Sequence, residues 1–292
     1  NFLNLINMKH QNLTEGPAGM TKREINIPFR FFSAGCCRRN ILIILLLFVF
    51  SVSGPSLMPA AGNSVEMESS LLPANPIAMP LPAPQDGDYQ TRATGNWNAN
   101  TTWQVRVSGA WVNCAPGDYP GAAPGAGTVW VNSGHVVTLN VNPANPIAGI
   151  TFVDGTTAAT TLILTGRTLN VTGDVIFSVP AADAGDQTIT LGTGILNCAS
   201  IYMPATGDAA YDLLITASTG TMNVTGNIIM DGASDQNNIT FTGAATINIG
   251  GDFRGGGYTP STGRVNYNGV NQTVGTYTYN NLNISGGGVK TL

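Results

Sequence analysis

The chain of 292 residues has very little charge, because Asp, Glu, Lys and Arg together make up only 10% of it. All four glutamates lie before residue 70, and the bases after Asp86 are scattered. These bases are Arg92, Arg106, Arg167, Arg254, Arg264 and Lys290. A nucleic-acid partner requires clustered Lys and Arg that neutralise phosphates. The charge distribution therefore argues against nucleic acid as a partner and predicts a surface of Thr, Asn, Ser and Asp, which favours strands and turns.

Histidine is equally scarce, and only His135 lies beyond the N-terminal region. It sits in the short segment "NSGHVVTL". A general base normally comes with a positioned partner residue, and none is recognisable in this segment. The sequence therefore predicts a turn residue at this position rather than a catalytic one.

The N-terminal region contains the features of a secretory signal peptide. Arg38 and Arg39 come directly before an unbroken apolar run at residues 41–50, and small residues follow. This order is typical of a signal peptide, so we assign residues 1–54 to an N-terminal extension and signal. The alternative is a retained membrane anchor, because residues 41–62 carry no charge. The predicted localisation is secreted or cell surface, with membrane contact only through an uncleaved signal.

A proline-rich segment at residues 55–90 follows the signal. Spaced prolines remove backbone donors and favour extended polyproline conformations. This segment is therefore predicted to be a linker.

The rest of the chain contains a repeat. The segment "LNVTGDVIF" at residues 169–177 returns as "MNVTGNIIM" at residues 222–230. Two further segments, "LNCASIYM" and "INIGGDFRG", align with these on their asparagine, with steps of 27, 26 and 25 residues. The aligned residues are Asn170, Asn197, Asn223 and Asn248. A fixed period of this size with short alternating strands is typical of a solenoid, and we predict a right-handed parallel β-helix with coils of about 26 residues.

Alternation along each repeat assigns the two faces of its strands. The predicted interior residues are Leu169, Val171, Val175 and Phe177, with their counterparts Met222, Val224, Ile228 and Met230. The repeated asparagines fall on the other face, where their amides are expected to bond from coil to coil. Glycines at the corners, Gly173, Gly226 and Gly250 or Gly251, are expected to adopt positive φ. A β-sandwich is the alternative, but it would not repeat an Asn-Val-Thr-Gly corner in register.

Two cysteines remain beyond the apolar run, Cys114 and Cys198. Cys198 takes the position that Val171 and Val224 hold in the repeat. Such a ladder position suits a buried free thiol that acts as a small hydrophobe. We therefore expect the two cysteines to be unpaired, and a disulfide between them is the alternative.

All four tryptophans precede the repeats. They are Trp97, Trp103, Trp111 and Trp130. A terminal repeat needs an atypical covering unit, so we predict a Trp-rich N-terminal cap at residues 91–146 and a solenoid at residues 147–292. The alternative is a sugar-stacking platform, in which Trp97, Trp103 and Trp111 would contact a glycan.

Two regions resemble a known group of proteins. "TGNWNANTTW" (residues 94–103) with "PGAGTVWVNSGHVVTLNVN" (residues 124–142), and "GRVNYNGVNQTVGTYTYNNLNISGGGVKTL" (residues 263–292), resemble modules of large secreted β-helical proteins of Bacteroidetes-type bacteria. The resemblance spans about residues 91–292. It implies export, often by type IX secretion, a place on or outside the cell surface, and an adhesin-like role without transferable catalytic residues. It also implies that the solenoid is truncated at the C-terminus.

The acidic residues of the repeats do not form a convincing catalytic pair. Asp174 and Asp252 take equivalent positions three coils apart, which at strand spacing places them roughly 14 Å apart. Glycosidase carboxylates lie only about 5 to 9.5 Å apart. The bases that a lyase needs, Arg167, Arg254 and Arg264, fall on different coils. No catalytic residue is therefore predicted.

The loops after the repeated segments contain further aspartates. They are Asp183, Asp186, Asp208, Asp212, Asp231 and Asp235. If these loops stack on one side, their carboxylates and carbonyls could hold Ca²⁺, which takes six to eight oxygen ligands. Solvated turn residues are the alternative, because Asp is common in turns.

The sequence thus predicts an exported structural or adhesive β-solenoid module that performs no catalysis. Its expected partners are glycans or proteins of the cell surface or matrix. The alternative is a polysaccharide lyase, a glycosidase or a glycan-binding module that uses a groove along the coils. No cofactor is expected other than possible Ca²⁺.

Overall fold

The computed structural model describes residues 81–153, 158–181, 185–206, 210, 212–232 and 236–292. All described residues belong to one compact unit. The predicted signal peptide, its anchor alternative and the linker before residue 81 lie outside the described residues. Within the described part, no helix is long and apolar enough to span a bilayer.

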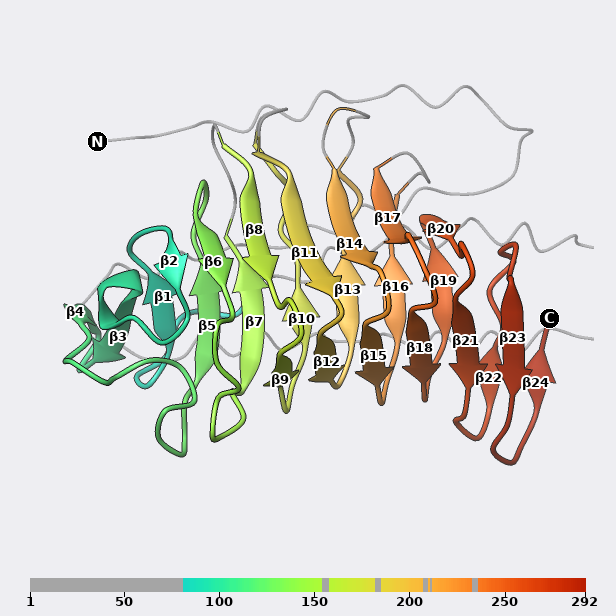
Figure 1. The fold of residues 1–292 in the computed structure, drawn as a ribbon, viewed down its shortest axis with the longest axis horizontal. Coiled ribbons are helices and arrows are strands. Elements are labelled where there is room, and N and C mark those ends of the chain that lie inside the picture. Colours follow the sequence, from blue (N-terminus) through green and yellow to red (C-terminus); the bar gives the residue numbers. More distant parts are fainter. Residues whose placement is uncertain (1–80, 154–157, 182–184, 207–209, 211, 233–235) are drawn as a thin grey trace, which may run out of the picture. The chain divides into compact units, whose positions relative to one another are not determined.

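The described chain is an all-β solenoid whose strands stack into long sheets (Figure 1). The nine-stranded sheet contains β1 (Tyr89–Thr91), β3 (Trp103–Val107), β4 (Ala110–Asn113), β5 (Thr128–Val131), β7 (Gly149–Phe152), β10 (Val175–Ile176), β13 (Ile201–Met203), β16 (Ile228–Met230) and β19 (Phe253–Gly255). The seven-stranded sheet contains β2 (Gly95–Asn96), β6 (Val136–Thr138), β8 (Thr160–Ile163), β11 (Gln187–Gly192), β14 (Leu213–Ala217), β17 (Asn237–Phe241) and β20 (Gly257–Thr259). The six-stranded sheet contains β9 (Thr168–Asn170), β12 (Ile195–Cys198), β15 (Thr221–Val224), β18 (Thr246–Ile249), β21 (Arg264–Tyr267) and β23 (Asn281–Ile284). A small sheet pairs β22 (Gln272–Thr273) with β24 (Lys290–Thr291).

Each regular coil adds one strand to each of the three large sheets. One coil runs through β11, β12 and β13, and the next runs through β14, β15 and β16, with parallel pairing between equivalent strands. In the six-stranded sheet Asn197 lies in register with Asn170 on one side and Asn223 on the other. The predicted solenoid is therefore confirmed, and its coils have about 25 residues, close to the predicted 26.

The coils shorten near the end of the described chain, which the constant period did not predict. Asn266 follows Asn248 by only 18 residues, because only Gly256 separates β19 from β20, whereas earlier coils have a longer loop between the equivalent strands. The next coil passes from β21 through β22 to β23 without a strand in the seven-stranded sheet. Aromatic side chains pack on this shortened side instead. Tyr258 packs with its ring centroids 5.5 Å from Phe253 and 5.7 Å from Tyr277.

The core is a set of apolar ladders inside the coils. All eight residues predicted to face inward are buried. The rings of Phe152 and Phe177 stack in adjacent coils with centroids 4.6 Å apart and planes 8° from parallel. Burial of such faces removes apolar surface from water, and one coil alone could not bury its own face.

The corner glycines serve a different purpose from the predicted one. Gly173, Gly226, Gly250 and Gly251 do not have positive φ, so that prediction was wrong. A Cβ on Gly173 would lie 2.4 Å from the carbonyl oxygen of Ala148, in the preceding coil. These corners require glycine because successive backbones approach too closely for a side chain.

The N-terminal part of the solenoid is covered by an antiparallel hairpin, β3 and β4. Trp97 and Trp103 form the core of this region. Both are fully buried, and their rings pack edge to face with centroids 5.0 Å apart. The Trp103 indole donates to the Trp97 carbonyl at 2.6 Å and the Trp97 indole donates to the Pro120 carbonyl at 2.9 Å. The solenoid starts before the predicted boundary at residue 147, because β5 and β6 already pair in parallel with β7 and β8.

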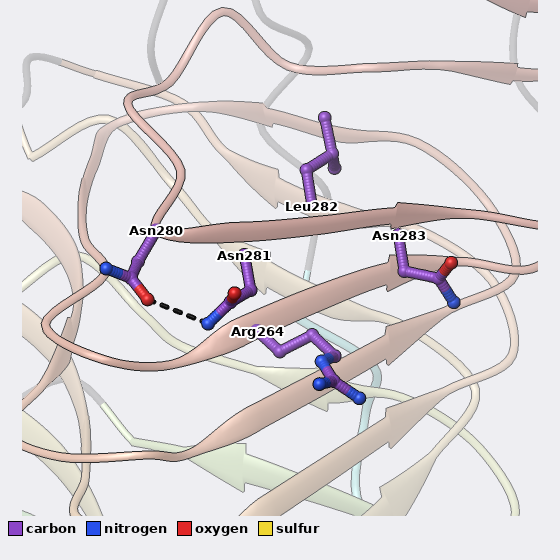
Figure 2. Close-up of a pocket in the computed structure, with 5 residues that line it drawn as sticks. All are labelled: Arg264, Asn280, Asn281, Leu282 and Asn283. Carbon is purple, nitrogen blue, oxygen red and sulfur yellow. Dashed lines mark hydrogen bonds between the residues drawn. The ribbon is translucent and has the colours of Figure 1, made fainter.

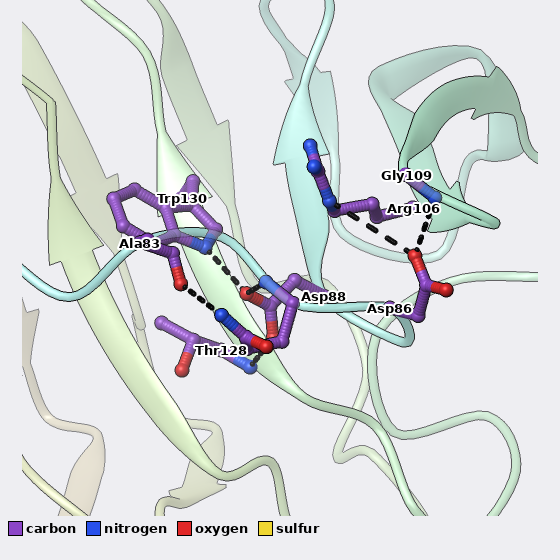
Figure 3. Close-up of polar contacts among 8 residues, drawn as sticks. Ala83, Asp86, Asp88, Arg106, Gly109, Thr128 and Trp130 are labelled. Atoms are coloured by element: carbon purple, nitrogen blue, oxygen red, sulfur yellow. Dashed lines mark hydrogen bonds and ion pairs between the residues drawn. The ribbon is translucent and has the colours of Figure 1, made fainter. Parts of the chain in front are cut away.

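A buried carboxylate connects the segment before β1 to β5 of the first coil through hydrogen bonds (Figure 3). Asp88 is only 5% exposed and accepts hydrogen bonds from the backbone N–H of Thr128 at 2.8 Å, the Trp130 indole at 3.0 Å and the backbone N–H of Gln85 at 2.8 Å. Three donors compensate for the burial of this carboxylate. Its role in this position is structural.

Candidate functional site

The most regular polar feature is an asparagine ladder on the outer face of the six-stranded sheet. In each pair the amide nitrogen donates to the side-chain oxygen of the preceding coil, at distances of 2.6 to 2.7 Å. The ladder contains the four predicted residues and one more, Asn170, Asn197, Asn223, Asn248 and Asn266. The prediction of coil-to-coil amide bonding is confirmed.

Sequence reasoning missed Asn266, because it expected the next residue about 26 positions on. The signal was present in the alternating segment "VNYN", whose first asparagine is Asn266. The side-chain oxygen of Asn266 is buried and has no hydrogen-bond partner among the described residues. Asn283 comes next in strand register and is exposed. The ladder therefore reaches Asn266 and leaves one acceptor unused there.

A second polar ladder follows the corner of the coils. The Ser200 hydroxyl oxygen accepts from the backbone N–H of Asn227 at 3.1 Å, and the Asn227 side-chain oxygen accepts from the backbone N–H of Asp252 at 2.8 Å. The Asp252 carboxylate in turn accepts from the Thr273 amide at 2.6 Å. Ser, Asn and Asp are interchangeable at this corner because each supplies an acceptor oxygen. The position occupied by Asp174 and Asp252 is thus part of the stacking of the coils.

Two shallow hollows lie beside the shortened coils. The larger, about 520 Å³, is lined by Arg264, Asn280, Asn281, Leu282 and Asn283. Figure 2 shows the Arg264 and Asn283 side chains extending toward the same side of β21 and β23, while Leu282 points the other way. Asn281 donates to the side-chain oxygen of Asn280 at 2.7 Å. A guanidinium and amides together offer donors for hydroxyl or carboxylate groups.

The second hollow, about 300 Å³, includes Arg254, Thr273, Thr276 and Tyr277 in its lining. Arg254 is exposed, whereas Tyr277 is half-buried and donates its hydroxyl to the Gly255 carbonyl. Burial raises the pKa of Tyr277 above its usual value, and the Arg254 charge lowers it by a smaller amount. Sequence reasoning did not identify either hollow, because each needs two shortened coils to come together.

The tryptophans predicted as possible glycan contacts are placed very differently from one another. Trp97 and Trp103 have no exposed surface, so neither ring is available to stack on a sugar. Trp111 is half-buried, and the Arg106 guanidinium lies 5.6 Å from the centre of its ring. Of the three, only Trp111 keeps ring surface for such a contact.

The aspartates predicted to bind Ca²⁺ are described only in part, since Asp183, Asp208 and Asp235 lie outside the described residues. The Asp186 side chain accepts from the Asp212 amide of the next coil at 3.2 Å, so these two loop ends do stack. Asp231 directly follows β16, whereas Asp186 and Asp212 directly precede β11 and β14. The backbone amide of Asp231 donates to the Met203 carbonyl at 2.8 Å. Within the described residues no three His, Cys, Asp or Glu side chains are grouped as metal ligands. Calcium binding stays a prediction.

Neither His135 nor the two cysteines has the surroundings of a catalytic group. A ring nitrogen of His135 lies 2.8 Å from the Thr91 hydroxyl, and burial lowers the pKa of this histidine. Cys114 and Cys198 are both buried and free, as predicted. Burial raises the pKa of each thiol to about 12, which removes the thiolate that nucleophilic chemistry requires.

The chain matches no protein-family model, no curated protein and no solved structure. Its own residues and geometry are therefore the basis for a proposal about function.

Proposed function

We propose that the chain is an exported structural or adhesive module, a β-solenoid that presents a repetitive polar surface to glycans or proteins of a cell surface or matrix. The observation that supports this proposal best is the unbroken asparagine ladder from Asn170 to Asn266. Side-chain ladders of this kind tie each coil to the next and resist bending and twisting. A stiff support suits a protein that must hold a contact away from the cell.

The chemistry of the outer surface is consistent with this role. Polar groups on the six-stranded sheet are mostly amides and hydroxyls, which form weak, reversible hydrogen bonds with other neutral polar groups. The candidate contact with a glycan is the larger hollow, where Arg264 adds one charge to the amides of Asn281 and Asn283. Bidentate guanidinium contacts would favour sugars that carry a carboxylate.

The test is adhesion by the purified full chain. Beads coated with the chain are applied to bacterial cells and to films of neutral and uronate-containing polysaccharides, and retention under flow is measured. We expect retention on at least one of these surfaces, reduced by Arg264→Ala. Arg167→Ala is the matched control, because Arg167 is also exposed but lies outside both hollows.

Two results would contradict the proposal. One is absence of retention on every cell and film tested. The other is turnover, seen as new reducing ends or unsaturated uronates released from the same films, which would instead support the alternative of a polysaccharide lyase or glycosidase. A lyase or glycosidase would require acids and bases that converge in one groove, which the hollows described above lack.

A further inference from the structure

The outer face of the seven-stranded sheet bears a rank of threonines. Parallel pairing places one residue from each successive strand in line across β6, β8, β11, β14, β17 and β20. Five of the six residues in this rank are threonine. In strand order they are Thr138, Ile163, Thr190, Thr216, Thr240 and Thr259.

A second rank runs beside the first, two residues earlier on each strand. Its members are Val136, Thr161, Thr188, Leu214 and Asn238. The residues between the two ranks point inward and are buried, among them Leu162, Ile189 and Ile215. The ten residues of the two ranks on β6 to β17 are all partly exposed. The face thus consists of methyl and hydroxyl groups, with a single amide and no charge.

The spacing of the two ranks is set by strand geometry. Neighbouring strands lie about 4.8 Å apart, and residues two apart on one strand are separated by about 6.6 Å. Hydroxyls and methyls therefore form a nearly rectangular two-dimensional lattice that extends roughly 19 Å across the five strands from β6 to β17. Figure 1 shows β8, β11, β14 and β17 running side by side along the solenoid.

This lattice is rigid in two respects, and its hydroxyls are also available. The neighbouring asparagine ladder fixes the stacking of the same coils and opposes sheet twist. Threonine is β-branched, so its χ1 angle is restricted and its hydroxyl stays near one position. Among the described residues, the Thr190, Thr216 and Thr240 hydroxyls have no hydrogen-bond partner. The hydroxyls are therefore pre-organised and available.

We propose that this face, the outer surface of β6, β8, β11, β14 and β17, binds ice. The oxygen atoms on a crystal face of ice form a two-dimensional lattice whose repeats are similar to the strand spacing and to the two-residue spacing. Each threonine hydroxyl both donates and accepts, as each lattice oxygen does. An uncharged face also suits an uncharged crystal. Binding would cost little further side-chain entropy, because folding already orders the threonine side chains.

Other neutral surfaces fit this face less well. Sugar recognition draws on aromatic rings together with precisely placed polar and charged side chains. The two ranks contain no aromatic residue and only one amide, Asn238. A lipid headgroup or nucleic acid would require basic residues, and the ranks have none. The proposal does not depend on the adhesive role, which was assigned to a different side of the coils.

The test is partition of the purified full chain into growing ice, measured together with inhibition of ice recrystallisation. The wild-type chain is expected to enter ice and to keep crystals small. Thr216→Lys places a charged, hydrated side chain at the centre of the rank and is expected to abolish both effects. Thr216→Val keeps the shape and removes one hydroxyl, so it should give a partial loss.

The matched control is Thr221→Lys, the same substitution in the same coil but on the outer face of the six-stranded sheet. It is expected to keep the wild-type activity. Far-ultraviolet circular dichroism establishes that each variant is folded, and Thr216→Val still tests the face if Thr216→Lys does not fold. Exclusion of the wild-type chain from ice would overturn the proposal, even if the chain is retained on crystalline chitin or cellulose. Equal losses in Thr216→Lys and Thr221→Lys would overturn it as well.

Discussion

Removal of one amide from the middle of the asparagine ladder should destabilise the solenoid measurably. Asn223 donates to Asn197 at 2.7 Å and accepts from Asn248 at 2.7 Å, so Asn223→Ala removes two hydrogen bonds. Each such bond is worth about 0.5 to 1.5 kcal/mol, which gives a loss of about 1 to 3 kcal/mol. For 150 to 250 ordered residues, 1 kcal/mol corresponds to about 2 to 4 °C in Tm, so the expected decrease is roughly 2 to 12 °C.

Two comparisons separate the ladder from a general effect of substitution. Asn170→Ala removes a single bond at the exposed end of the ladder, so the loss should be about half as large. Asn223→Asp keeps the shape but replaces the donor with a second acceptor, which faces the Asn197 oxygen. Asn223→Asp should therefore destabilise the chain at neutral pH and recover part of the loss when the carboxyl is protonated.

The assay is thermal and urea unfolding followed by circular dichroism, with all variants in the same buffer. The reasoning would be refuted if Asn223→Ala and Asn170→Ala lowered stability equally. It would also be refuted if Asn223→Asp were tolerated to within about 0.5 kcal/mol, the range of an ordinary surface substitution.

Three further predictions concern buried and crowded positions. Because burial raises the pKa of Cys114 and Cys198 to about 12, iodoacetamide at pH 8 should modify both only after unfolding, as followed by mass spectrometry. Burial lowers the pKa of His135 below its usual value of 6.5, so the unfolded chain binds the proton more tightly and stability should fall as pH drops below 6.5. His135→Gln should remove this pH dependence in urea titrations, and an unchanged dependence would contradict the assignment. Gly173→Ala should cost about 1 to 3 kcal/mol because its Cβ would overlap a backbone oxygen, whereas Gly287→Ala, with open space around it, should change Tm little.

The repeat was predictable from sequence because stacking requires the same side chain at the same place in each coil. Asparagine recurs at 27, 26 and 25 residues because each amide must meet the next one at hydrogen-bond distance. The corner is less strict, since Ser200, Asn227 and Asp252 all supply one acceptor oxygen. The repeated asparagine identified the solenoid. The variable corner residue argued against a catalytic role for the corner aspartates, because a catalytic carboxylate could not be replaced by Ser or Asn.

Other features depend on contacts that no period reveals. The coil that leads to Asn266 is shorter because a single residue separates β19 from β20. The next coil has no strand in the seven-stranded sheet, and Tyr258 and Tyr277 pack together on this side. The corner glycine Gly173 looks the same in sequence whether it serves positive φ or close approach, and only the position of the Ala148 oxygen distinguishes the two. The two hollows also escaped prediction, because their walls come from coils of irregular length.

The outer faces of the six-stranded and seven-stranded sheets differ in how many side-chain hydrogen-bond donors and acceptors remain unused. On the six-stranded sheet, Asn197, Asn223 and Asn248 use a donor and an acceptor on one another, so their strongest hydrogen-bonding directions are already satisfied. On the seven-stranded sheet, Thr190 and Thr216 are also in register, but within the described residues their hydroxyls have no hydrogen-bond partner. Asparagine amides that hydrogen-bond to one another stabilise the stacked coils. Ordered threonine hydroxyls without such partners are available to hydrogen-bond to an external lattice. This difference in unused hydrogen-bonding capacity is the physical reason for proposing that the threonine ranks, and not the asparagine ladder, bind an external lattice.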